Sequence, residues 1–292
     1  MLSLKFLAAV LFFSSLFTGG TSSSCRSESN KVAPIPSENI AGELKVIAEG
    51  AHSPVTTAFV AVIRDTDTYA ALRQVASNIP ELDADFFKSN VVIAAFLGER
   101  NTGGYSVEIT RDTDGKIRVA EKAPGKDMMV PQMITAPFKV VSLATAGTPP
   151  VSVSVADSFH QTAELYRISS GTFSISGGFA GRTETFQLTG KLQVSRLGNL
   201  ITIGFAVVST GAQRERQLRE MATGVVSDNG ITINRLSRGS LVDTPSGDFH
   251  LTGRFLDKNK LTLALDTGVV TVPDGYSGKG SIEAEMVSAS AN

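Results

Sequence analysis

The amino-acid sequence predicts a mainly β protein, in which an α+β domain (an antiparallel sheet with one helix) precedes an all-β sandwich or open-barrel domain. Short runs rich in β-branched and aromatic residues recur throughout the folded region. A single segment in the first half combines an N-cap signal with helical spacing of apolar residues. In the second half, Gly, Asn and Asp turn signals separate the runs at the short intervals typical of all-β domains. A Pro-Pro pair closes the segment 147–150, so we expect domains at residues 43–146 and 151–292.

Charge composition argues against two kinds of binding. The 292 residues include 27 Lys and Arg and 28 Asp and Glu, for a formal net charge of −1. Nucleic-acid binding usually requires a basic excess, which this chain lacks, so we expect no nucleic-acid partner. The sequence also lacks a polybasic patch that would hold the folded part on an anionic membrane.

The first 24 residues have the pattern of a signal peptide. A short segment with one lysine, Lys5, precedes an apolar run at residues 6–17, which is too short for a comfortable transmembrane helix. Small residues fill positions 18–24. We therefore expect the protein to be exported to a bacterial cell envelope.

Cys25, the single cysteine of the chain, directly follows this signal. A lone cysteine in an exported protein cannot form an internal disulfide, and this position indicates a lipoprotein acceptor. Ser22 departs from the aliphatic residue usual three positions earlier, and the alternative is cleavage among the serines that leaves Cys25 free. With lipidation, the lipid is the expected membrane contact, and the polar residues 25–42 form a flexible tether.

The first domain is predicted to contain six strands and one helix. Asp65 is the expected N-cap, Tyr69, Leu72 and Val75 follow at helical spacing, and the helix should stop by Pro80. The predicted strands cover residues 44–48, 57–63, 91–97, 105–109, 116–120 and 138–143.

Residues 91–109 are the most informative stretch. A buried apolar strand at 91–97 leads into a glycine-rich connection, after which Tyr105, Val107 and Ile109 alternate with polar residues. This pattern predicts a hairpin with a long loop. The adjacent Gly103 and Gly104 indicate positive φ or a close approach by another group.

A family resemblance rests on this stretch. The run Phe-Leu-Gly-Glu-Arg-Asn-Thr-Gly-Gly-Tyr-Ser-Val-Glu-Ile, residues 96–109, resembles the core motif of the PrcB C-terminal domain family, which is named for a subunit of a bacterial cell-surface protease complex. The preceding helical segment, the proline-containing residues 123–137 and the following strand resemble the family's flanking parts, so that the resemblance covers about residues 43–145. It implies an accessory, non-catalytic role and supplies no catalytic residue.

The second domain is predicted to contain a duplicated hairpin. Phe-Gln-Leu-Thr-Gly-Lys-Leu at 186–192 is repeated as Phe-His-Leu-Thr-Gly-Arg-Phe at 249–255, each followed by a turn and a return strand. Residues 213–221 are compatible with a short helix or a solvated edge strand. The predicted strands cover residues 172–176, 184–194, 200–208, 224–226, 231–236, 248–256, 261–265, 269–272 and 281–287.

Catalytic and metal-binding patterns are weak. The three histidines, His52, His160 and His250, are widely separated, and the pair His160 and Glu164, which could share a helix face, lacks further zinc ligands. No nucleophile elbow occurs, and the glycines of residues 98–104 lack the lysine of a phosphate-binding loop. We therefore expect no enzyme activity, cofactor or metal, although a Ser-His-Asp arrangement formed only in the fold stays open.

The connection after the strand at 91–97 is the candidate partner-contact loop, because loops held on rigid strands commonly carry binding. Tyr105 either packs in the core, which its alternation favours, or contacts a partner. Met128 and Met129 either form an adaptable contact pair or fill gaps in the core. The candidate residues of the loop are Glu99, Arg100, Asn101, Thr102, Gly103, Gly104 and Tyr105.

The function expected from these observations is that of a non-enzymatic, envelope-anchored lipoprotein that assists or scaffolds a protein partner, such as a surface protease. The alternative is an extracytoplasmic ligand-binding module in which the β domain holds a glycan or a peptide. The absence of tryptophan makes a glycan platform less favourable. A cryptic hydrolase is the weakest of the three hypotheses.

Overall fold

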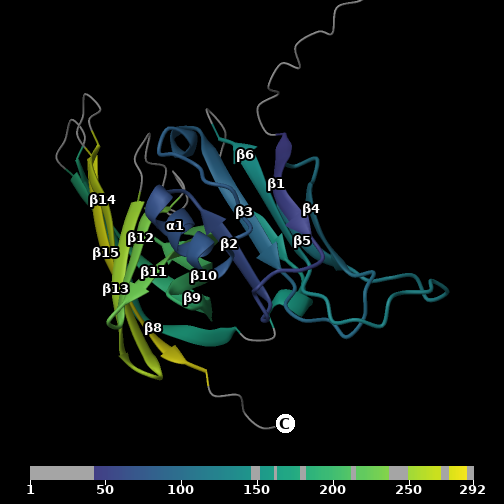
Figure 1. Cartoon of the computed structure of the whole chain (residues 1–292). Helices are drawn as coiled ribbons and strands as arrows, with labels where there is room; N and C mark the ends of the chain where they lie inside the picture. Colours follow the sequence, from purple (N-terminus) through teal and green to yellow (C-terminus); the bar gives the residue numbers. More distant parts are fainter. Residues whose placement is uncertain are drawn as a thin grey trace, which may run out of the picture. The chain divides into compact units, whose positions relative to one another are not determined.

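The computed structural model describes residues 43–145, 152–160, 163–177, 182–211, 215–236, 249–270 and 276–287 (Figure 1). These residues fall within one compact unit, residues 39–292. The predicted signal peptide, Cys25, the tether and the Pro-Pro boundary lie outside the described residues. Among the helices that are described, none has both the length and the apolar character needed to span a membrane.

The first part of the fold consists of two β-sheets and a short α-helix, which confirms the predicted α+β class. An antiparallel sheet has the strand order β1-β6-β3-β2, and a smaller sheet has the order β4-β5-β7, in which β7 runs parallel to β5. The strands are β1 (Leu44–Gly50), β2 (Phe59–Ile63), β3 (Asn90–Phe96), β4 (Ser106–Arg111), β5 (Ile117–Lys122), β6 (Phe138–Ala144) and β7 (Val153–Val155).

The predicted hairpin between residues 91–97 and 105–109 is wrong. Strand β3 pairs with β2 and β6, whereas β4 pairs with β5 in the other sheet. The burial of β3 explains the error, because its residues from Val91 to Phe96 are all buried and it occupies an interior position with a neighbour on each side. The chain after β3 therefore crosses to the other sheet, and the apolar faces of both sheets meet in a shared core.

The helix α1 (Thr66–Val75) begins as predicted. Asp65 is its N-cap, and the Asp65 side chain accepts a hydrogen bond from the backbone N–H of Thr68 at 2.9 Å. The helix ends at Val75, before the predicted limit at Pro80. The hydroxyl of Tyr69 donates to the carbonyl of Pro80 at 2.8 Å, and burial raises the pKa of Tyr69 to about 12, so this donor keeps its proton at neutral pH.

The second part of the fold is an eight-stranded barrel, which closes because β8 pairs with both β9 and β15 (Figure 1). The all-β prediction is thus confirmed, with closure replacing the expected sandwich or open barrel. Hydrophobic side chains from all eight strands fill the interior, as is usual for a barrel of this size. The strands are β8 (Glu164–Gly177), β9 (Arg182–Leu197), β10 (Leu200–Thr210), β11 (Glu215–Ser227), β12 (Gly230–Leu236), β13 (Phe249–Asp257), β14 (Lys260–Val270) and β15 (Tyr276–Met286).

The repeated sequence motif forms two hairpins of this barrel. The first copy lies on β9, which pairs with β10, and the second lies on β13, which pairs with β14. The two copies are four strands apart in the barrel order and therefore occupy opposite walls. Two local expectations are corrected: the ambiguous residues 215–221 form part of strand β11 and no helix, and β14 continues through Val270 where a separate strand was expected at 269–272.

The edge strand β2 of the first sheet lies against barrel strand β11. The backbone N–H of Val62 donates to the hydroxyl of Thr223 at 2.7 Å. Arg64 and Glu220 form an ion pair at 3.2 Å, and both side chains are almost fully buried. Strand β7, which follows the predicted boundary at 147–150, pairs with β5 of the first part. Residues from both sides of that boundary thus contribute to one packed unit.

Candidate functional site

The candidate contact loop is joined to a second loop, and we call residues 98–105 and 123–137 together the loop pair. Arg100 and Thr135 exchange two backbone hydrogen bonds, at 2.7 and 2.9 Å. The N–H of Gly103 donates to the carbonyl of Pro131 at 2.9 Å, and the Thr135 hydroxyl donates to the carbonyl of Thr102 at 3.0 Å. These bonds hold two loops that are separate in sequence in one fixed arrangement.

The Arg100 side chain connects the first loop, residues 98–105, to strand β5. Its guanidinium forms two parallel hydrogen bonds with the Glu121 carboxylate, at 3.2 and 3.0 Å, and also donates to the carbonyls of Leu97 and Glu99. It lies 5.8 Å from the centre of the Tyr105 ring. These hydrogen bonds direct the Arg100 side chain towards Glu121 on β5 and hold the start of the loop against that strand. No sequence spacing predicts the contact between Arg100 and Glu121, because the pairing of β4 with β5 brings Glu121 to the loop.

Two glycines permit the course of the first loop. Gly98 has φ of +70°, and a Cβ there would lie 2.7 Å from the carbonyl oxygen of Thr56. Gly104 has φ of +84°, and a Cβ there would lie 2.8 Å from Val130 and 2.9 Å from Pro124 in the second loop. The prediction of positive φ within the Gly-Gly pair is confirmed at Gly104.

The remaining candidate residues differ in exposure. Glu99, Asn101 and Gly104 are exposed, Gly103 is buried under Pro131, and Thr102 is half-buried. Tyr105 is also half-buried, packs against the core shared by the two sheets and lines a groove on its other side. Tyr105 thus packs partly against the core, as its alternation predicted, and is partly accessible from the groove; contact with a partner stays a prediction.

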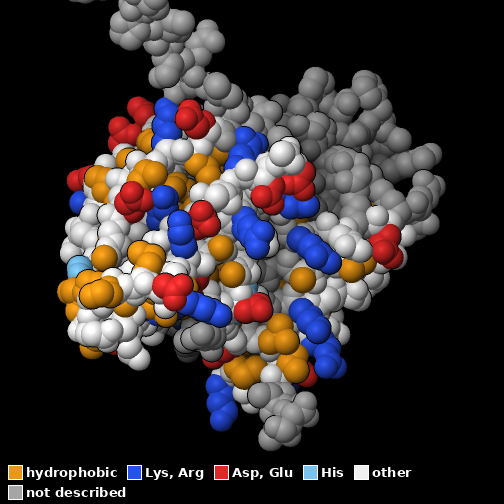
Figure 2. Space-filling view, turned by 90° about the vertical axis from the view of Figure 1, so that its right-hand side faces the viewer, with side chains coloured by type: hydrophobic (Ala, Val, Ile, Leu, Met, Phe, Trp, Pro, Cys, Tyr) orange, Lys and Arg blue, Asp and Glu red, His pale blue; other side chains and the backbone are white. Residues whose placement is uncertain are grey.

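The second loop carries a group of exposed apolar side chains that we call the apolar loop residues. They are Met128, Met129, Met133 and Ile134, which are 64%, 98%, 47% and 64% exposed. These four are more than half of the seven large hydrophobic side chains that are exposed in the described part of the chain. Figure 2 faces the side on which β1, β4 and β5 lie in Figure 1, and it shows hydrophobic side chains reaching the surface between charges of both signs. Because Met128 and Met129 are exposed, the alternative that they fill gaps in the core is wrong. The alternative that they form a contact pair stays a prediction.

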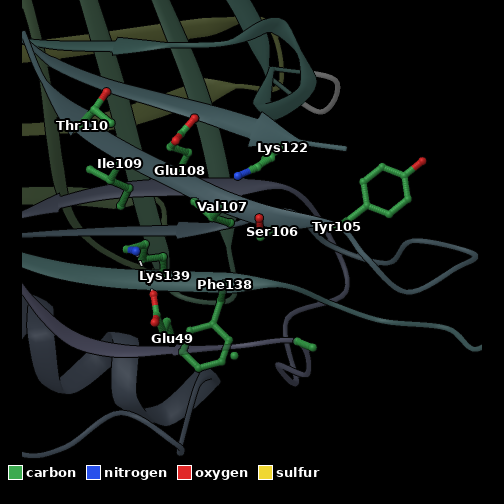
Figure 3. Close-up of a pocket in the computed structure, with 12 residues that line it drawn as sticks. Glu49, Tyr105, Ser106, Val107, Glu108, Ile109, Thr110, Lys122, Phe138 and Lys139 are labelled. Carbon is green, nitrogen blue, oxygen red and sulfur yellow. Dashed lines mark ion pairs between the residues drawn. The ribbon is translucent and has the colours of Figure 1, made fainter. Parts of the chain in front are cut away.

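An open groove of about 530 Å³ lies beside the loop pair (Figure 3). One wall is β4 from Ser106 to Thr110, with Tyr105 at its loop end. The other side is formed by the end of β1 and the start of β6, where Glu49 and Lys139 form an ion pair at 2.7 Å. The groove therefore runs between two sheets, next to the same loops that carry the apolar loop residues.

The three histidines lie in different elements of the described structure. His52 precedes β2 in a loop, His160 follows a short 3-10 helix (Asp157–Phe159) and His250 lies on β13. The suggestion that His160 and Glu164 share a helix face is wrong, because Glu164 begins strand β8 and pairs with Arg196. No group of three His, Cys, Asp or Glu side chains in the described residues could hold a metal ion.

Comparison with known proteins bears on one segment. No protein of curated function and no solved structure matches the chain. A family model described as PrcB C-terminal matches residues 91–144, which run from β3 to β6 and include both loops of the loop pair. The suspected resemblance is thereby confirmed over this segment, which is similar to the PrcB C-terminal family and in that respect consistent with an accessory subunit associated with a protease.

Proposed function

We propose that this protein is a non-enzymatic accessory subunit that binds a protease of the cell envelope through the apolar loop residues. The observation that carries the proposal is the exposure of Met128, Met129, Met133 and Ile134 on a loop held by backbone hydrogen bonds. The family match to residues 91–144 supports a protease-associated role for the segment that contains this loop.

The chemistry of these residues suits a protein partner. Methionine is unbranched and polarisable, so it adapts to the shape of an opposing apolar surface. Exposed apolar groups gathered on one loop lose contact with water when a partner covers them, and this favours association. Because the loop is already ordered by Arg100 and Thr135, binding would cost less conformational entropy than it would for a free loop.

The test is affinity purification of the tagged protein from native envelopes in mild detergent, with the partner quantified by mass spectrometry. The variant is Met128→Ser combined with Met129→Ser. Since both side chains are exposed, we expect folding stability to change by less than about 0.5 kcal/mol. Partner recovery should fall at least about tenfold, equivalent to about 1.4 kcal/mol of binding free energy.

The matched control is Leu256→Ser, which makes the same kind of change at an exposed position of β13 in the barrel. This control should retain the partner at the wild-type level. Equal recovery from wild type and the double variant would refute the proposed role of the apolar loop residues, and equal loss in the control would show that the effect is not local to the loop.

We also propose that a lipid on Cys25 anchors the protein at a membrane surface of the envelope. The supporting observation is the position of the single cysteine directly after a signal-peptide pattern. Replacing Cys25 with serine should move most of the protein from the membrane fraction to the soluble fraction, as measured by ultracentrifugation and immunoblotting. An unchanged distribution between the two fractions would contradict lipid anchoring.

A further inference from the structure

Strand β4 is an edge strand with one backbone neighbour. In the described residues it pairs with β5 over Ser106–Arg111, and it stands at the end of the order β4-β5-β7. On its open side it therefore presents a row of backbone N–H and C=O groups towards the groove. Such an edge is the structural requirement for adding an extended segment as a further strand.

The opposite sheet is one strand wider, which leaves part of it uncovered. Val46 on β1 pairs in register with Val141 on β6, so their side chains share one face of the sheet. Val141 lies in the core between the two sheets and is 1% exposed, whereas Val46 is 53% exposed. The difference arises because β1 lies at the sheet edge, beyond the cover that β4 provides. One more strand beside β4 would extend that cover over β1.

The side chains along this edge define what would bind. Val107 and Ile109 point into the core, and Ser106, Glu108 and Thr110 are exposed on the outer face (Figure 3). None of the ion pairs between described side chains involves Glu108, and Lys122 on β5 lines the same groove. A basic side chain on an added strand would lie opposite or diagonal to this carboxylate, and an apolar side chain on the other face would cover Val46.

We propose that the groove between β1 and β4 binds an extended segment of the partner protein, which adds to the free edge of β4 as a strand. The segment would alternate apolar residues, directed towards Val46, with polar or basic residues, directed towards Glu108. This inference rests on the proposed function and specifies how the partner is recognised. A second copy of this chain is a less favourable occupant, because the antiparallel register that pairs Glu108 with itself places two carboxylates side by side.

The probe is a fluorescein-labelled, C-terminally amidated decapeptide, Thr-Val-Lys-Val-Thr-Val-Lys-Val-Thr-Val, compared with the same peptide carrying Glu in place of Lys. Binding to the full mature chain is measured by fluorescence anisotropy and located by hydrogen exchange with mass spectrometry. We expect saturable binding of the Lys peptide, at least about threefold tighter than that of the Glu peptide, with new protection at residues 106–111. The Glu108→Lys variant should reverse the preference, whereas Glu283→Lys, a charge reversal on the exposed face of barrel strand β15, should leave it unchanged.

The inference would be overturned by no binding of the Lys peptide at 1 mM, by binding without protection of residues 106–111, or by equal responses in wild type and Glu108→Lys. A β4-dependent dimer in sedimentation would also overturn it by identifying a second copy as the occupant. The proposed function is tested separately. If Glu108→Lys recovers the envelope partner as well as wild type while the Met128 and Met129 variant does not, the groove inference fails and the proposed function stands.

Discussion

Replacing Glu220 with alanine is expected to destabilise the protein by about 3–5 kcal/mol, the usual effect of removing one partner from a buried ion pair. Arg64 and Glu220 are 3.2 Å apart, and their side chains are 6% and 3% exposed. The substitution would leave the Arg64 guanidinium in a site from which water is largely excluded. Guanidinium chloride unfolding at neutral pH, followed by circular dichroism, measures the change.

A matched control and a rescue variant make this prediction specific. The pair Lys260 and Glu285 lies on the barrel surface with both side chains more than half exposed, so Glu285→Ala should cost less than about 1 kcal/mol. Combining Arg64→Met with Glu220→Leu should restore much of the stability, because well-packed apolar residues can replace a buried ion pair. A change below 1 kcal/mol for Glu220→Ala would contradict the close packing of β2 against β11.

Replacing Gly190 with alanine should destabilise the barrel by on the order of 4 kcal/mol, through backbone strain combined with steric overlap. Gly190 has φ of +130°, and a Cβ there would lie 2.2 Å from the carbonyl oxygen of Ala206 on the adjacent strand. Neither β9 nor β10 can shift easily to relieve this overlap, because both strands belong to a closed barrel. Thermal and chemical unfolding of the variant, compared with wild type, measures the loss.

Gly204→Ala is the matched control for Gly190→Ala. Gly204 lies on the neighbouring strand β10, and a Cβ added there would lie 3.7 Å from Gln193, which is an ordinary van der Waals distance. The control should therefore change stability by less than about 1 kcal/mol. Equal effects of the two substitutions would show that the close approach at Gly190 is not a constraint of the barrel.

Local chemistry could be predicted from the sequence where it depends on neighbouring residues. The helix start at Asp65 and the positive φ of Gly104 both follow from what these residue types do in the chain around them. The repeated motif, first seen at Phe186–Leu192, also has a local cause. Each copy contains a glycine, Gly190 or Gly253, at a position where the backbone of the neighbouring strand approaches closely. A Cβ at Gly253, the counterpart of Gly190, would lie 2.4 Å from the carbonyl of Thr262.

Long-range pairing could not be predicted from local pattern. The alternation of Tyr105, Val107 and Ile109 identified a strand but not its partner, and the strand pairs with β5 in a different sheet. Barrel closure likewise depends on β8 meeting β15, more than a hundred residues later in the chain. For the candidate site, local pattern could indicate a glycine-rich loop, but the ion pair between Arg100 and Glu121 depends on tertiary pairing that no local spacing predicts.

Site-specific photo-crosslinking in intact envelopes tests whether the apolar loop residues contact a protease. A benzophenone amino acid replaces Met129, and in a separate strain it replaces Leu256 on the barrel, both at exposed positions. After irradiation, position 129 is expected to crosslink to one protease in a defined complex, while position 256 should give no such product. The absence of a protease crosslink at position 129, or the same product from both positions, would contradict the assignment of the loop as the partner-binding surface.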